Sequence, residues 1–239
     1  MKKIFLELVE FIKAAKSGAR NPFRAALANT RGGTLRLIAV VPAYDDLTIS
    51  LHSLLKKNIE AQADHSLLGA AASKEALDKV FSAHRKAFVV FCGHGFTQAL
   101  ATAPDLGEHP HLYNEKHSEI FNKESVAACD ELTLFAYACN SGKRLGPSIE
   151  QRGGVFIGFS DMIPFPWNSL SGMKISPLFQ EPVALVMDDF KRRGTIDSHT
   201  RDSLRAWYTR EISRSKARRD KYATLHRNIL RWHLDEFYR

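Results

Sequence analysis

The sequence has few cysteines and no long hydrophobic run. It holds 3 cysteines in 239 residues. An odd number, widely spaced, does not build a disulfide framework, so we expect a protein of the reducing cytosol. Apolar runs such as residues 87–92 are far shorter than the roughly 20 residues needed to cross a membrane. Glu7 and Glu10 interrupt the hydrophobic stretch that a secretory signal would require. The sequence therefore predicts a cytoplasmic protein without a membrane partner.

Internal repeats, low-complexity tracts and Pro/Gly/Ser-rich linkers are also missing. The composition of 44% hydrophobic and 25% charged residues is ordinary for a globular protein. We therefore expect a single domain over residues 1–239. Its core spans about 34–208, preceded by a helical segment at 1–30 and followed by basic helices at 197–239.

Positive charge is concentrated at one end of the chain. The net charge is +8, and residues 191–239 carry 14 of the 34 Lys and Arg but only 6 of the 26 Asp and Glu. The remaining residues are therefore neutral overall. Any contact with a polyanion belongs at the C-terminus.

Short apolar runs alternate with helical patterns along the core. Strands are predicted at 35–41, 88–92, 132–138 and 155–159, with a further candidate at 67–70. Helices are predicted at 46–63, 73–84, 118–128, 143–151, 176–193 and 197–237, and a loop at 97–115. This alternation predicts an α/β fold, a three-layer α/β/α sandwich with a mainly parallel central sheet. Ligands and chemistry then gather at the carboxyl ends of the strands.

Two strand ends carry residues suited to nucleophilic catalysis. One strand stops at Gly93-His94-Gly95, and another leads into Cys139. A thiol becomes a strong nucleophile with help from a nearby imidazole. The amides of Gly95 and Cys139 are candidate donors to a developing oxyanion. On spacing alone the plainer interpretation stays open, since such cysteines often only pack and Cys92 is expected in the core.

The two segments FVVFCGHG and LFAYACNSGKRLG resemble caspase-like (clan CD) cysteine peptidases, and most of all the bacterial CHAT peptidases. The resemblance covers roughly residues 34–208 and implies a caspase-like fold. It implies a cysteine endopeptidase with His94 and Cys139 as the catalytic dyad, an oxyanion hole made by Gly95 and Cys139, and no cofactor or metal. Its partners would be a protein substrate and a separately encoded activator or sensor, in stress response, cell death or anti-phage defence.

The same resemblance points to residues that would bind the substrate side chain. They are Asp45 and Asp46 in the loop after the first strand, Tyr137 two residues before the nucleophile, and Asp161 after the final strand. Acids at these places would favour Arg or Lys in the substrate. The alternative is that Asp46 caps the following helix and Asp161 belongs to a turn. The segment at 160–167 departs from the usual CHAT pattern, so its substrate contacts do not carry over.

A second function stays open: a catalytically silent caspase-like scaffold that binds nucleic acid or a protein through its basic C-terminal helices. Arginines recur there near helical spacing, interleaved with Trp207, Tyr208 and Tyr222: Arg201, Arg205, Arg210, Arg214 and Arg218. The favoured interpretation is a solvated helix face or a docking surface for an activator. Ser141-Gly142-Lys143 is no phosphate loop, because Tyr137 stands where the upstream glycine is required.

Overall fold

The computed structural model describes residues 35–84, 86–104, 117–128, 131–164, 177–217 and 223–237. The chain divides into two compact units, Met1–Leu35 and Arg36–Arg239. Only Leu35 of the first unit is described, so the predicted helical segment at 1–30 lies outside the described residues. The prediction of a single domain over the whole chain stays a prediction.

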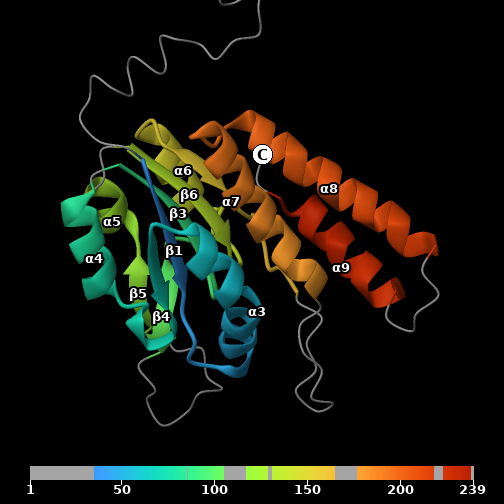
Figure 1. Ribbon diagram of the computed structural model, residues 1–239, viewed down its shortest axis with the longest axis horizontal. Helices are drawn as coiled ribbons and strands as arrows, with labels where there is room; N and C mark the ends of the chain where they lie inside the picture. Colours follow the sequence, from blue (N-terminus) through green and yellow to red (C-terminus); the bar gives the residue numbers. More distant parts are fainter. Residues whose placement is uncertain are drawn as a thin grey trace, which may run out of the picture. The chain divides into compact units, whose positions relative to one another are not determined.

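The second unit is built on a five-stranded parallel sheet (Figure 1). Its strands run in the order β2-β1-β3-β6-β7. They are β1 (Arg36–Val41), β2 (His65–Leu68), β3 (Lys86–Cys92), β6 (Glu131–Tyr137) and β7 (Val155–Ile157). The three central strands are apolar because both of their faces are covered: every residue from Leu37 to Val41 is buried, as is every residue from Ala87 to Cys92.

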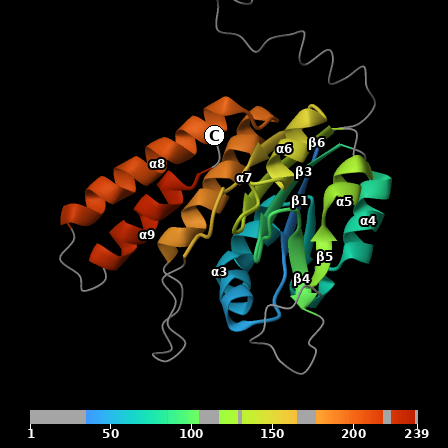
Figure 2. The same cartoon turned by 180° about the vertical axis from the view of Figure 1, so that it is seen from behind.

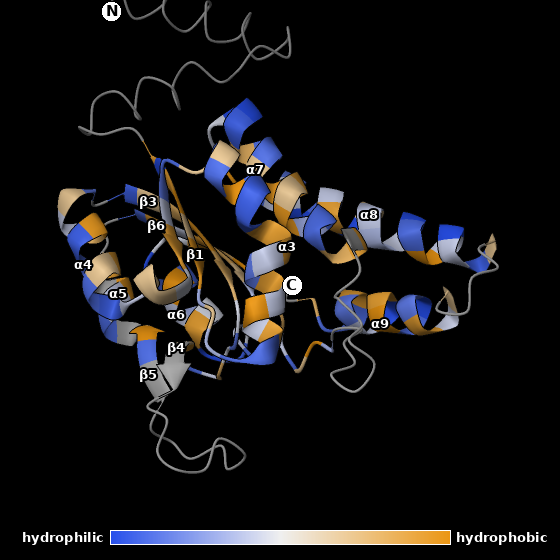
Figure 3. Ribbon diagram, turned by 60° about the horizontal axis from the view of Figure 1, so that its bottom comes forward, coloured by the Kyte–Doolittle hydropathy of each residue, from blue (hydrophilic) through white to orange (hydrophobic). Residues whose placement is uncertain are grey.

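Helices cover both faces of this sheet, which confirms the α/β class and is compatible with the predicted three layers. One face packs on α4 (Lys74–Ala83), α5 (Lys123–Ala128) and α6 (Leu145–Gln151). The other packs on α3 (Asp46–Gln62) and α7 (Glu181–Arg193), where the Phe88 and Phe190 rings lie 4.8 Å apart. The two opposite views agree on this division (Figures 1 and 2). Hydrophobic residues concentrate in the central strands (Figure 3).

Two helices follow α7. They are α8 (Ser198–Ala217) and α9 (Ala223–Asp235), which pack against each other. The helical pattern predicted over 197–237 is thus divided between two helices. Buried residues on both helices explain the pairing, since Leu204 and Tyr208 on α8 and Leu230 on α9 are fully inaccessible.

A small antiparallel hairpin was not predicted from the sequence. It joins β4 (Leu100–Pro104) to β5 (His117–Phe121), where a loop and the start of a helix were predicted. β4 is rich in small residues, and neither strand shows the β-branched alternation that marks a strand. Buried Leu100, Ile120 and Phe121 extend the core on the α4 and α5 face of the sheet. Within the described ranges, none of the helices combines the length and hydrophobicity needed to span a bilayer.

Candidate active site

The two strand ends that carry His94 and Cys139 lie side by side. Strands β3 and β6 are parallel neighbours, with Cys92 paired to Tyr137 at their last residues. The Gly93 amide then donates to the Tyr137 carbonyl at 3.3 Å, so the contact continues past the strands. The turns that hold the candidate base and the candidate nucleophile therefore leave the same edge of the sheet.

His94 is held by a carboxylate from the neighbouring strand end. Its Nε2 lies 2.6 Å from Asp45 Oδ2, and the Tyr44 ring centroid lies 5.8 Å from its own. Because a carboxylate only accepts hydrogen bonds, Nε2 carries the proton. In the neutral ring Nδ1 is then the basic nitrogen.

The Asp45 carboxylate makes two contacts in this structure, one with the start of α3 and one with His94. It is the N-cap of α3, where Oδ1 accepts from the Thr48 amide at 2.8 Å, while Oδ2 faces His94. The cap is therefore Asp45 and not Asp46. Burial acts to raise the pKa of Asp45, but the hydrogen bonds from His94 and Thr48 outweigh it and hold this pKa below its usual range. The carboxylate is thus kept charged beside the imidazole.

The Cys139 sulfur is partly covered by the loop after β7. The Ile163 amide donates to Sγ at 3.4 Å, and the Ile163 carbonyl oxygen lies 3.9 Å from it. Burial raises the pKa of the Cys139 thiol above its usual range, although the Ile163 amide acts in the opposite direction. Within the described part of the chain no hydrogen bond joins this sulfur to the His94 ring. The raised pKa favours the neutral thiol in the resting site.

Gly95 packs directly on the main chain of the nucleophile turn. A Cβ atom there would overlap the Cys139 carbonyl oxygen and would lie 2.8 Å from Ala138 Cβ. Among the described residues, neither the Gly95 nor the Cys139 amide donates to a main-chain carbonyl. Main-chain carbonyls therefore occupy neither of these two candidate oxyanion donors within the described ranges.

We expect Gly95→Ala to separate the two strand ends. The added methyl group has main-chain neighbours that cannot rotate away, so the variant loses roughly 1–3 kcal/mol of unfolding free energy. Gly93→Ala is the matched control, because its nearest contact is the Phe91 ring edge at 3.2 Å. Urea unfolding of both variants measures the difference, and equal stabilities would show that the Gly95 contact has no consequence.

The other predicted substrate-binding residues fall in different environments. Tyr137 is fully buried, with its hydroxyl 3.3 Å from His233 Nδ1, so it is not open to a substrate in this structure. Strand parity does place it on the Cys139 side, but α9 covers that face. Asp46 is exposed in the first turn of α3. Asp161 is exposed, accepts from the Met162 amide at 2.8 Å, and lies 3.5 Å from Lys143 Nζ.

The structure adds three residues that sequence reasoning did not single out. They are Ile163 at the sulfur, Pro164 beside it, and His233 on α9, whose Nε2 lies 2.7 Å from the Pro164 carbonyl oxygen. His233 follows Ile229 and Leu230 at helical spacing on the buried face of α9. That spacing was the one available signal, and it indicates burial rather than a role.

Most of the C-terminal arginines that recur near helical spacing make contacts within the protein. Arg201 donates to Glu150 Oε1 at 2.6 Å and to the Phe156 carbonyl at 2.7 Å. Arg205 lies 5.4 Å from the Phe237 ring centroid, and Arg214 pairs with Glu211 at 2.7 Å. Trp207 and Tyr208 are buried, whereas Arg218 and Tyr222 lie outside the described residues. Trp207 and Tyr208 are therefore not available for stacking on bases.

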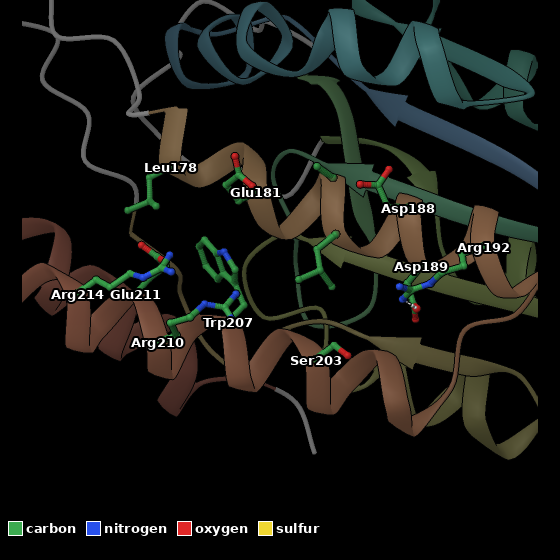
Figure 4. A pocket seen from close by; sticks show the side chains of 12 residues that line it. Leu178, Glu181, Asp188, Asp189, Arg192, Ser203, Trp207, Arg210, Glu211 and Arg214 are labelled. Carbon is green, nitrogen blue, oxygen red and sulfur yellow. Dashed lines mark hydrogen bonds and ion pairs between the residues drawn. The ribbon is translucent and has the colours of Figure 1, made fainter. Parts of the chain in front are cut away.

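A groove of about 890 Å³ lies between α7 and α8 (Figure 4). Arg210 and Arg214 line it, but so do Glu181, Asp188 and Glu211. Opposite charges thus alternate along its walls. Such a surface lacks the single positive sign that tracks a phosphate backbone.

No metal-binding cluster of three or more His, Cys, Asp or Glu occurs among the described residues. No protein-family model matches the chain, and a search of curated proteins finds no match either.

Proposed function

We propose that this protein is a cysteine endopeptidase of the caspase type, with Cys139 as nucleophile and His94 as general acid and base. Asp45 orients His94, and the Gly95 and Cys139 amides hold the oxyanion. The observation that carries the proposal is the convergence of these groups at the ends of two adjacent parallel strands, with a carboxylate already on the imidazole. The expected setting is a regulated bacterial protease of stress response, cell death or anti-phage defence.

Acylation follows from the protonation states of the resting site. As Cys139 Sγ attacks the scissile carbonyl carbon, its proton passes to His94 Nδ1 and a carbon–sulfur bond forms. The carbonyl electron pair moves to the oxygen, which accepts hydrogen bonds from the Gly95 and Cys139 amides. When the adduct collapses, the carbon–nitrogen bond breaks and His94 returns the proton to the leaving amine.

Deacylation reverses these roles. Water attacks the thioester carbonyl while His94 Nδ1 takes one of its protons. The carbon–sulfur bond then breaks, the carboxylic acid product leaves, and the proton returns to the sulfur. Throughout, the Asp45 carboxylate stabilises the imidazolium that forms in each half-reaction.

Two substrate contacts accompany the mechanism. Asp46 and Asp161 are exposed carboxylates near the two turns in sequence, and Asp161 is tied to the nucleophile turn because the Asn140 amide donates to its carbonyl at 3.0 Å. The hydrogen bond from the Met162 amide holds the pKa of Asp161 below its usual range, with a further contribution from Lys143. A charged Asp161 would favour Arg or Lys in the substrate, in exchange for its contact with Lys143.

The test combines labelling with product mapping. We expect a peptide ketone to modify wild type and Cys92→Ala but not Cys139→Ala, because Cys92 is fully buried. His94→Ala should lose reaction with the ketone while keeping reaction with iodoacetamide, which needs no bound peptide. Mapping new N-termini in a proteome should give cleavages in wild type that fall on the order of 10³-fold or more in Cys139→Ala.

A matched surface substitution, Lys74→Ala on α4, controls for handling of the variants, because Lys74 is exposed and pairs with the exposed Asp78. Labelling that persists in Cys139→Ala, or a set of new N-termini identical in wild type and Cys139→Ala, would contradict the proposal. A salt-dependent shift of nucleic acid by both proteins would instead favour the scaffold function.

A further inference from the structure

Several hydrogen bonds join the loop after β7 to the nucleophile turn, and main-chain amides donate three of them. The Asn140 amide donates to Asp161 O at 3.0 Å, the Gly142 amide to Phe159 O at 2.7 Å, and the Ile163 amide to Cys139 Sγ at 3.4 Å. Ile163 itself is only 3% exposed. One residue of this loop is thus buried against the candidate nucleophile. Residues 161–164 are called the covering segment below.

The last turn of α9 holds this loop from the other side. His233 Nε2 donates to the Pro164 carbonyl at 2.7 Å, and the Ser160 amide donates to the Glu236 carbonyl at 2.7 Å. Phe159 and Phe237 form an antiparallel bridge. The contacts lie on both ends of the covering segment, so its position depends on where α9 sits.

His233 joins three parts of the site. Since the Pro164 carbonyl only accepts, Nε2 carries the ring proton and Nδ1 accepts from the Tyr137 hydroxyl, 3.3 Å away. Tyr137 precedes Cys139 by two residues on the same strand end. The ring therefore links the nucleophile strand, the covering segment and α9 within a shell of aromatic residues: Tyr137, Phe159, Phe179 and Tyr208.

We propose that His233 is a positioning residue that keeps the covering segment on the Cys139 sulfur, so that the described arrangement is the closed form of the site. Displacing the end of α9 opens it. The inference rests on the proposed cysteine chemistry. A substrate carbonyl must come within about 3–3.5 Å of the sulfur, and the Ile163 amide nitrogen already lies at that distance. Burial of the thiol, which raises its pKa, fits a site closed in this way.

The test measures the rate of iodoacetamide modification at Cys139, located by mass spectrometry in the full chain. His233→Leu removes the donor to Pro164 and should raise this rate about 10-fold. His233→Gln keeps an N–H donor and should stay within about 2-fold of wild type. Trp232→Ala is the matched control, since this neighbouring side chain is 50% exposed on the same helix.

Cys92 separates local opening from global unfolding, because it is fully buried on β3. Modification that rises at Cys139 alone supports the proposal, whereas equal increases at both cysteines in His233→Leu would overturn the positioning role. Should His233→Leu not fold, Ser160→Ala removes the hydroxyl that donates to Glu236 at 3.0 Å and should raise the Cys139 rate about 2-fold to 3-fold. An unchanged rate in folded variants would also overturn the proposal.

Alkylation needs neither substrate nor His94, so this result is separate from peptidase activity. A chain that cleaves nothing but opens selectively in His233→Leu would contradict the proposed function and leave the closed form standing. A chain with Cys139-dependent cleavage and an unchanged alkylation rate in His233→Leu would support the proposed function and contradict the closed form.

Discussion

Asp45→Asn should lower kcat/KM by about 10²–10⁴ while the protein stays folded. The amide would donate to His94 Nε2 instead of accepting from it, which moves the ring proton to Nδ1 and removes the base that the thiol needs. Asn is also among the best N-cap residues, so α3 keeps its start. Steady-state kinetics on a peptide that wild type cleaves would measure the loss.

Thr48→Ala is the matched control for Asp45→Asn. It removes the partner of the capping box, in which Thr48 Oγ1 lies 2.8 Å from Asp45 Oδ1, but leaves the contact with His94. We expect a loss of about 1 kcal/mol in stability with little change in kcat. Comparable losses of kcat in both variants would contradict the positioning role of Asp45.

The two interpretations of Asp45 predict different kinetic signatures. A carboxylate in a pocket for basic side chains would, when neutralised, raise KM for Arg and Lys substrates and alter residue preference. If Asp45 instead orients His94, its neutralisation lowers kcat for every substrate alike. The 2.6 Å contact favours the second outcome, and a shift of preference without loss of kcat would restore the sequence-based interpretation.

The central sheet was predictable because its strands are buried on both faces. Residues at β1, β3 and β6 are apolar almost throughout, and the helical patterns between them require parallel crossovers. The hairpin of β4 and β5 was not predictable, because Leu100, Ile120 and Phe121 are buried against a core that other segments form. The break between α8 and α9 was not predictable either, because a polar stretch in the middle of a helical pattern does not show where a helix ends.

The candidate site was predictable only in part, for a similar reason. His94 and Cys139 stand at strand ends, and parallel strands bring their carboxyl ends to one edge. The role of Asp45 was not predictable, because it depends on one carboxylate oxygen facing the start of α3 and the other facing His94. Tyr137 and His233 are 96 residues apart, and no local pattern announces that α9 covers the nucleophile strand.

Acid should destabilise the protein through His233, whose burial lowers its pKa to about 4. The unfolded imidazole takes up a proton near its usual pKa of about 6.5, while the folded ring stays neutral, so stability present at pH 7 is lost as the pH falls toward 4. The buried groups packed on it, Tyr137 and Tyr208, both have raised pKa values and carry no charge in this range. They therefore do not offset the loss.

The size of this effect can be measured by comparison with His233→Gln. Between pH 7 and pH 4.5 the His233 contribution amounts to roughly 2–3 kcal/mol of unfolding free energy, and the variant lacks it while sharing every other titrating group. Urea unfolding of both proteins at the two pH values should therefore give a smaller decline for His233→Gln. Parallel declines would mean that the folded ring takes up a proton as readily as the unfolded chain, which is incompatible with a neutral His233 bridging Tyr137 and Pro164.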